Sequence, residues 1–130
     1  MTNLPAPFED AITIQIANWL RVALPLGCGI PWTHFPAGEL RNKKIGSKLR
    51  RMGTIRGWPD FQFLYQGLFI GIEIKRPPSR SNRRGVQTDD QKKLQLQISG
   101  QGGAYHIAYS GKDVEDHLRM HGVPLRARFM

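Results

Sequence analysis

Every second residue is apolar or aromatic along two short segments, 61–65 and 68–74, which flank the dipeptide Gln66-Gly67. Alternation with a period of two is typical of strands, and glycine at the second turn position accepts a positive φ, so these segments predict a β-hairpin. A two-residue turn fixes the register, with Phe61 facing Ile72 and Asp60 facing Glu73. One face of the hairpin is then apolar (Phe61, Phe63, Tyr65, Leu68, Ile70, Ile72 and Ile74), and the other carries Asp60, Gln62, Gly71, Glu73 and Lys75.

The remaining pattern predicts four helices and two more strands. Apolar residues at helical spacing predict helices over 9–24, 40–52, 88–99 and 113–120, and alternation predicts strands over 32–35 and 104–109. In the second helix, the expected inner side is Leu40, Ile45, Leu49 and Met52; the third begins with a capping-box pattern, Thr88-x-x-Gln91. The order helix, strand, helix, hairpin, helix, strand, helix predicts an α/β (α+β) protein with a mixed sheet flanked by helices.

A chain of 130 residues has room for one domain, which we place at 8–122, with a loose arm at 1–7 and a tail at 123–130. No apolar run approaches the roughly 18 residues that a membrane span needs, and the N-terminus does not resemble a secretory signal. The single cysteine, Cys28, fits a reducing compartment, so we expect a cytoplasmic, intracellular protein without a membrane partner.

Asp60 and Glu73 would repel each other if they met across the hairpin. A divalent cation between them would turn that repulsion into a binding site, and Mg²⁺ or Mn²⁺ prefers such oxygen ligands. Lys75 lies two residues beyond Glu73 and therefore on the same face, where it is placed to orient or help deprotonate a water, or to neutralise a phosphate. The plainer interpretation is a solvated strand face with an ordinary Glu–Lys pair.

The net charge of +9 is concentrated in two segments that flank these acids in the sequence. Basic residues beside an acidic centre suit a phosphodiester substrate, because cations hold the backbone while carboxylates hold a metal. Charge alone also fits an anionic membrane, although nucleic acid is the better match. The expected DNA-binding residues are Arg41, Lys43, Lys44, Lys48, Arg50, Arg51, Arg56, Arg76, Arg80, Arg83 and Arg84.

Several motifs occur in an order that resembles the PD-(D/E)xK nucleases and, among them, the VRR-NUC group. They are Phe8-Glu9, Asn18-Trp19-Leu20-Arg21, Thr33-His34-Phe35-Pro36, Leu49-Arg50-Arg51-Met52-Gly53, Gly57-Trp58-Pro59-Asp60, Glu73-Ile74-Lys75 and Gln91. The similarity spans about residues 8 to 110. The chain departs from the pattern at Ala37, where relatives often carry Asn, and in its longer Arg-rich loop 79–85.

This resemblance implies a restriction-endonuclease-like core and metal-dependent hydrolysis of phosphodiesters. Glu9, Asp60 and Glu73 then correspond to the acidic metal ligands, joined by the backbone carbonyl of Ile74. Lys75 corresponds to the catalytic lysine, and Gln91 to a glutamine that completes the site. Helix capping explains Gln91 equally well, and a helix-start acid explains Glu9. Stand-alone members look similar to Holliday junction resolvases, so the resemblance also implies branched DNA as substrate. A chain of 130 residues that reaches two strands is expected to act as a homodimer or higher homo-oligomer.

Two other function classes remain open to the sequence. One is a non-catalytic DNA-binding module that has kept the fold, against which the presence of all four residues Glu9, Asp60, Glu73 and Lys75 argues. The other is a zinc hydrolase, for which the only ligand spacing is His117 and His121, without the intervening glutamate of the zincin motif.

Overall fold

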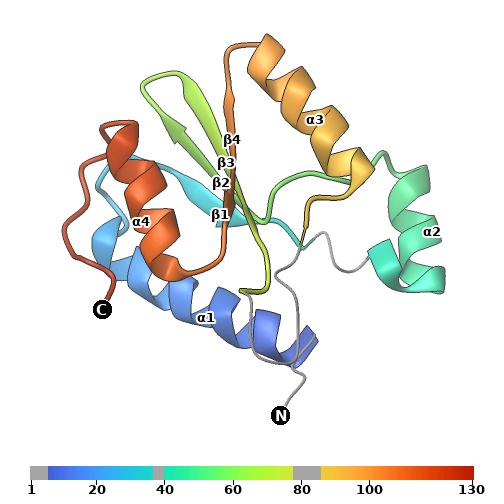
Figure 1. Ribbon diagram of the computed structural model, residues 1–130, viewed down its shortest axis with the longest axis horizontal. Coiled ribbons are helices and arrows are strands. Elements are labelled where there is room, and N and C mark those ends of the chain that lie inside the picture. Colours follow the sequence, from blue (N-terminus) through green and yellow to red (C-terminus); the bar gives the residue numbers. More distant parts are fainter. Residues whose placement is uncertain (1–5, 37–39, 78–85) are drawn as a thin grey trace.

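The predicted elements are present in the predicted order. The computed structural model describes residues 6–36, 40–77 and 86–130, and of residues 6–9 it describes only the backbone. Within these ranges the elements are α1 (Ala6–Ala23), β1 (Trp32–His34), α2 (Lys43–Arg51), β2 (Phe61–Tyr65), β3 (Leu68–Ile74), α3 (Asp89–Gly100), β4 (Ala104–Ala108) and α4 (Gly111–Met120) (Figure 1). The four strands form one mixed sheet in the order β1-β2-β3-β4.

The β2–β3 hairpin has the predicted turn and register. Gln66 and Gly67 both have positive φ, 49° and 79°, as a type I′ turn requires. Phe61 pairs with Ile72 and Tyr65 with Leu68 in an antiparallel ladder, whereas β3 pairs in parallel with β4. The register therefore directs alternate apolar residues of both strands, from Phe61 to Ile74, to one face of the sheet. Phe69 and Glu73 lie on the other face.

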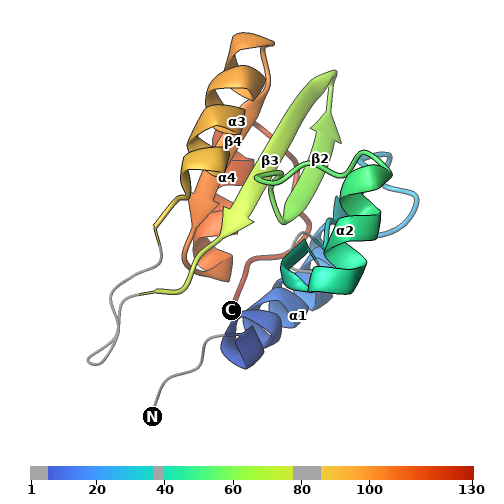
Figure 2. The same ribbon diagram turned by 90° about the vertical axis from the view of Figure 1, so that its right-hand side faces the viewer.

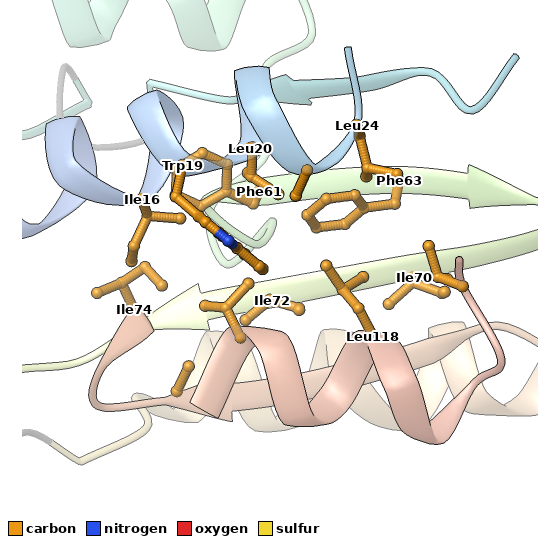
Figure 3. Packing of buried hydrophobic residues seen from close by; sticks show 14 residues of the cluster. Ile16, Trp19, Leu20, Leu24, Phe61, Phe63, Ile70, Ile72, Ile74 and Leu118 are labelled. Carbon is orange, nitrogen blue, oxygen red and sulfur yellow. The ribbon is translucent and has the colours of Figure 1, made fainter. Parts of the chain in front are cut away.

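Helices cover both faces of the sheet. Helices α1 and α4 lie on the apolar face, where Ile16, Leu20 and Leu118 pack against the large side chains of the hairpin (Figure 3). Helix α3 lies on the opposite face (Figures 1 and 2), where Leu94 and Ile98 form a smaller cluster with Tyr105. This second layer is the one that meets the polar side of the hairpin, so α3 can deliver side chains to Glu73.

The C-terminal segment, expected as a tail, packs against α1 and α4. The indole Nε1 of Trp19 donates to the Ala127 carbonyl at 3.3 Å, and the Phe129 ring meets the Trp19 ring edge-on with centroids 5.6 Å apart. The backbone N–H of Phe129 donates to the buried carboxylate of Glu115 at 3.2 Å. Residues 123–129 thus close the outer side of the main core.

The sequence predicted that four residues of the α2 segment face the protein interior, and this prediction is wrong for two of them. Leu40 is buried, but the side chains of Ile45 and Met52 are 46% and 71% exposed. The helix approaches the rest of the chain at Gly46, where an added Cβ would lie 2.5 Å from the Leu40 carbonyl oxygen, and it makes few contacts with the other helices and strands. Figures 1 and 2 show α2 at the periphery of the molecule.

No helix in the described parts of the chain combines the length and the apolar character needed to cross a membrane.

Gly71, in the middle of β3, is predicted to be intolerant of a side chain. A Cβ built at Gly71 would lie 2.3 Å from Cγ of Pro59 and 3.1 Å from the Phe69 ring, so Pro59 or the strand must move. We expect Gly71→Ala to lower the free energy of unfolding by about 1–3 kcal/mol, the usual cost of overpacking. Urea denaturation measures this, with Gly100→Ala as the control, since no atom lies within 4 Å of a Cβ there. Equal stability of the two variants would contradict the close packing of Pro59 on Gly71.

Candidate active site

The segment before β2 is held against α3 and β4. Gly57 has φ +97°, and a Cβ at this position would lie 2.9 Å from the Asp90 carbonyl oxygen in the first turn of α3. The Tyr105 hydroxyl donates to the Gly57 carbonyl at 2.9 Å. The Trp58 ring meets Phe69 edge-on, with centroids 6.0 Å apart. Glycine is therefore required here by both backbone conformation and space, and the approach to β2 is fixed by packing.

Asp60 lies at the start of β2 with its carboxylate bound to the other strand of the hairpin. Its Oδ2 accepts a hydrogen bond from the backbone N–H of Ile74 at 2.8 Å. Its own carbonyl accepts from the N–H of Phe35 at 2.7 Å, which ties it to the segment after β1. Pro59, packed on Gly71, limits how the chain enters the strand. The Asp60 carboxylate is thus oriented beside the end of β3, as the predicted register requires.

Glu73 is buried, with 7% of its surface exposed, and only one of its carboxylate oxygens is satisfied by the described residues. Oε2 accepts from Nε2 of Gln91 at 2.8 Å and lies 3.6 Å from Nζ of Lys75. Oε1 is buried and has no hydrogen-bond partner among the described residues. A buried, unpaired carboxylate oxygen is costly, so this oxygen requires a proton, a cation or another ligand.

The electrostatics of the site lead to the same requirement. Burial, and after it the negative charge of Asp60, raise the pKa of Glu73 to about 8, against the opposing effects of Lys75 and Gln91. The two carboxylates are therefore close enough to repel each other. A divalent cation would relieve this repulsion, and would replace the proton that Glu73 otherwise holds.

Gln91, in the first turn of α3, has both of the roles that the sequence left open. The capping box is confirmed: Gln91 Oε1 accepts from the Thr88 N–H at 2.9 Å, and Thr88 Oγ1 accepts from the Gln91 N–H at 3.2 Å. The capping bond uses the amide oxygen, which leaves the Nε2 group to donate to Glu73. Capping thus fixes the rotamer that directs the amide nitrogen into the site.

The residues at this site fit a hard divalent cation. Two carboxylates in electrostatic contact, one with a buried unpaired oxygen, form the kind of oxygen-rich site that Mg²⁺ occupies through one or two carboxylates, substrate phosphates and water. Among the described side chains, no group of three or more His, Cys, Asp or Glu is arranged to hold a metal ion. The side chain of Glu9 lies outside that description, so its role stays a prediction.

Two groups near the carboxylates were not predicted from the sequence. The first is the backbone N–H of Ile74, which donates to Asp60. Only the carbonyl of this residue was predicted from the sequence, as a metal ligand. The hydroxyl group of Tyr105 is the second: burial, and then the charges of Glu73 and Asp60, raise its pKa. Tyr105 packs with Leu94 and Ile98 of α3, and no pattern in the sequence links it to Gly57.

The basic residues expected to bind DNA fall into three groups. Those in and around α2 are exposed to solvent: Arg41, Lys43, Lys44, Lys48, Arg50, Arg51 and Arg56. Arg76, one residue beyond Lys75, is half-buried. Arg80, Arg83 and Arg84 lie outside the described residues, as do Ala37 and the loop 79–85.

Three histidines meet between β4 and α4. Nε2 of His106 lies 2.7 Å from Nε2 of His121, and the His106 ring stacks on His117 with centroids 4.3 Å apart. Nε2 of His117 is 2.9 Å from the Ile107 carbonyl oxygen. This hydrogen bond joins helix α4 to strand β4. Burial, and the neighbouring His117 and His121, lower the pKa of His106 to about 4.

Comparison with known proteins identifies the fold. A solved structure described as a VRR_NUC domain protein matches with a TM-score of 0.67, covering 92% of this chain and 89% of that chain. This chain has the VRR_NUC fold. The sequence identity is 21%, so the match shows the VRR_NUC architecture, a restriction-endonuclease-like mixed sheet flanked by helices. No protein-family model and no curated protein sequence matches the chain.

The raised pKa of Glu73 predicts that the free energy of unfolding depends on pH when a chelator is present. Its pKa is about 8 in the folded protein and about 4.5 when unfolded, so the unfolded chain releases its proton first. Stability from this group is complete below pH 4.5 and is lost as the pH rises to 8, by up to about 1.4 kcal/mol per pH unit. We expect urea denaturation in EDTA to show this loss, and Glu73→Gln, which cannot ionise, to remove it. A pH profile unchanged by Glu73→Gln would contradict the raised pKa.

Proposed function

We propose that this protein is a divalent-metal-dependent DNA endonuclease that hydrolyses phosphodiester bonds, with Mg²⁺ or Mn²⁺ as cofactor. The observation that carries the proposal is the buried Glu73 carboxylate, with Oε1 unpaired among the described residues, next to Asp60 and Lys75. A surface acid needs no such neighbours, and a purely structural buried acid has both oxygens paired, as Glu115 does with Arg119 and Phe129.

Asp60 and Glu73 are the proposed metal ligands, with Glu9 and the carbonyl of Ile74 as further candidates. The cation, when bound, would lower the pKa of a water and neutralise charge on the phosphate. The Ile74 N–H holds the Asp60 carboxylate in one orientation, and Gln91 holds that of Glu73. Gln91 of α3 restrains one carboxylate, and a backbone N–H of the hairpin restrains the other. The two carboxylates therefore need little reorientation when the reaction occurs.

Lys75 is the proposed catalytic lysine. Its ammonium group is 3.6 Å from Glu73 Oε2 and is mostly shielded from solvent, with 14% of its side chain exposed. Water attacks phosphorus, the bond from phosphorus to the leaving oxygen breaks, and negative charge grows on the phosphoryl oxygens. A positive charge in a poorly solvated position stabilises that growing charge more strongly than it would in water, and it also helps to orient the water.

The exposed cations around α2, together with Arg76 and the basic loop beyond it, are proposed to hold the DNA backbone. Seven lysines and arginines lie within residues 41–56, and this segment contains no acid. Such a surface binds phosphates without selecting a base sequence, so DNA shape is the expected basis of recognition. Branched DNA such as a Holliday junction or a flap is therefore our proposed substrate, and a homodimer would place two sites on its two strands.

Two substitutions separate catalysis from DNA binding. We expect Asp60→Asn and Lys75→Met each to reduce DNA cleavage by a factor of about 100 or more, because each removes a charge that acts in the transition state. DNA binding measured in EDTA should change less than about threefold, since the cations around α2 remain. Cleavage of a labelled four-way junction, a flap, a plain duplex and a single strand with Mg²⁺ or Mn²⁺ is the measurement.

Lys93→Met is the matched control for Lys75→Met, because Lys93 is an exposed lysine of α3. Cleavage by Lys75→Met at the rate of the Lys93→Met control would rule out the proposed catalytic lysine. DNA binding by the wild type without cleavage of any of the four substrates would instead favour a non-catalytic DNA-binding module.

A further inference from the structure

The segment 40–56, which we name the basic arm, presents apolar side chains to solvent among its cations. We propose that Met52 and Ile55 of the basic arm contact bases that are unstacked at a DNA branch point, and that this contact makes the protein prefer branched DNA to duplex. The inference rests on the proposed nuclease function, because it concerns how the DNA is recognised. It is carried by the exposure, charge and position of the arm.

The apolar side chains of the basic arm are accessible to a partner. Ile45, Met52 and Ile55 are 46%, 71% and 61% exposed. Ile45, half-buried Leu49 and Met52 follow each other at spacings of four and three residues, so they lie on one side of α2. An apolar stripe on a helix that packs loosely is a surface suited to binding.

Charge limits what the partner can be. The cations of the arm have no carboxylate within 4.0 Å among the described residues, so their charge is available to a partner. The whole chain carries a net charge of +9, and two copies meeting through their basic arms would repel each other. The occupant of this surface should therefore be a polyanion that also offers apolar surface.

Nucleic acid with unstacked bases meets both conditions. In plain duplex the phosphates are accessible but the flat base surfaces are stacked on each other, whereas at a branch point some bases expose a face to solvent. Apolar side chains inserted at base steps are a known means of holding distorted DNA. An anionic membrane also combines charge and apolar surface. However, the basic arm has only three large exposed apolar side chains, on the nine-residue helix α2 and the segment after it. This is a small apolar face for a helix that binds a membrane surface.

The position of the arm also favours DNA. Ile55 lies five positions before Asp60, so the Cα atoms of these two residues are at most about 18 Å apart, even with the chain fully extended. With DNA rising 3.4 Å per base pair, that distance spans about five base pairs. A base contact by the arm would therefore set the cleavage position close to the branch.

The test measures DNA binding in EDTA, so that it does not depend on cleavage. Fluorescence anisotropy compares a four-way junction with a duplex of equal length, and 2-aminopurine at the branch reports base stacking. We expect Met52→Ser combined with Ile55→Ser to weaken junction binding about tenfold and to abolish the 2-aminopurine response, with duplex binding changed less than about twofold. The matched control combines Ile14→Ser with Met120→Ser, whose side chains are 61% and 63% exposed on α1 and α4. It should bind both DNAs as the wild type does.

Two further variants keep the result interpretable. Ile55→Ser alone lies outside α2, so it should show a reduced version of the same selective loss even if Met52→Ser perturbs the helix end. Lys44→Gln with Lys48→Gln should weaken junction and duplex binding equally. Equal effects of the apolar and the lysine variants on the two DNAs would overturn the proposal. Two other results would also overturn it. One is that the double variant Met52→Ser with Ile55→Ser loses binding to anionic phospholipid vesicles but still binds the junction. The other is that this variant changes only the self-association of the protein.

Absence of cleavage by the wild type would refute the proposed nuclease activity. The binding measurements in EDTA could still be interpreted, because they do not depend on cleavage. Selective loss of junction binding in the apolar variant would then still support base contact by the arm.

Discussion

A two-residue turn places two carboxylates together, and the site depends on this constraint. Because Gln66 and Gly67 accept positive φ, the hairpin has one register, and that register brings the end of β3 beside the start of β2. Shifting the register by one residue would move Glu73 to the apolar face, where it would meet the core against α1 and α4. The apolar side chains that form this core therefore also keep the two acids in place.

The surrounding layers make the acid pair both costly and useful. Helix α3 shields Glu73 from water and supplies Gln91, and the residues Gly57 to Pro59 keep Asp60 close by tight packing on α3 and β3. A buried acid next to another acid is costly in free energy, and the proposed cation would lower that cost. The same burial would make the positive charge of Lys75 more effective toward the proposed phosphate substrate. The basic arm lies at the periphery of the molecule, where its cations and the side chains of Met52 and Ile55 are exposed.

Local patterns predicted the fold well, and packing decided the rest. Strand alternation and the turn chemistry of Gln66-Gly67 were sufficient for the hairpin, and the capping box predicted the start of α3. Helical spacing also predicted α2, but it assigned Ile45 and Met52 to an inner side, because periodicity shows which residues share a face and not whether anything covers it. The contacts of Tyr105 with Gly57 and of Phe129 with Trp19 join residues far apart in the chain, which no local pattern encodes.

The central claim is that Asp60 and Glu73 share a divalent cation. Calorimetric titration of Mn²⁺ into the protein bound to DNA with a non-hydrolysable phosphorothioate linkage tests it directly, because substrate phosphate then supplies the remaining ligands. We expect saturable Mn²⁺ binding that Asp60→Asn and Glu73→Gln each weaken at least about tenfold. Asp116→Asn, at an exposed acid of α4, is the control. Mn²⁺ binding of equal affinity in the wild type and both site variants would contradict it.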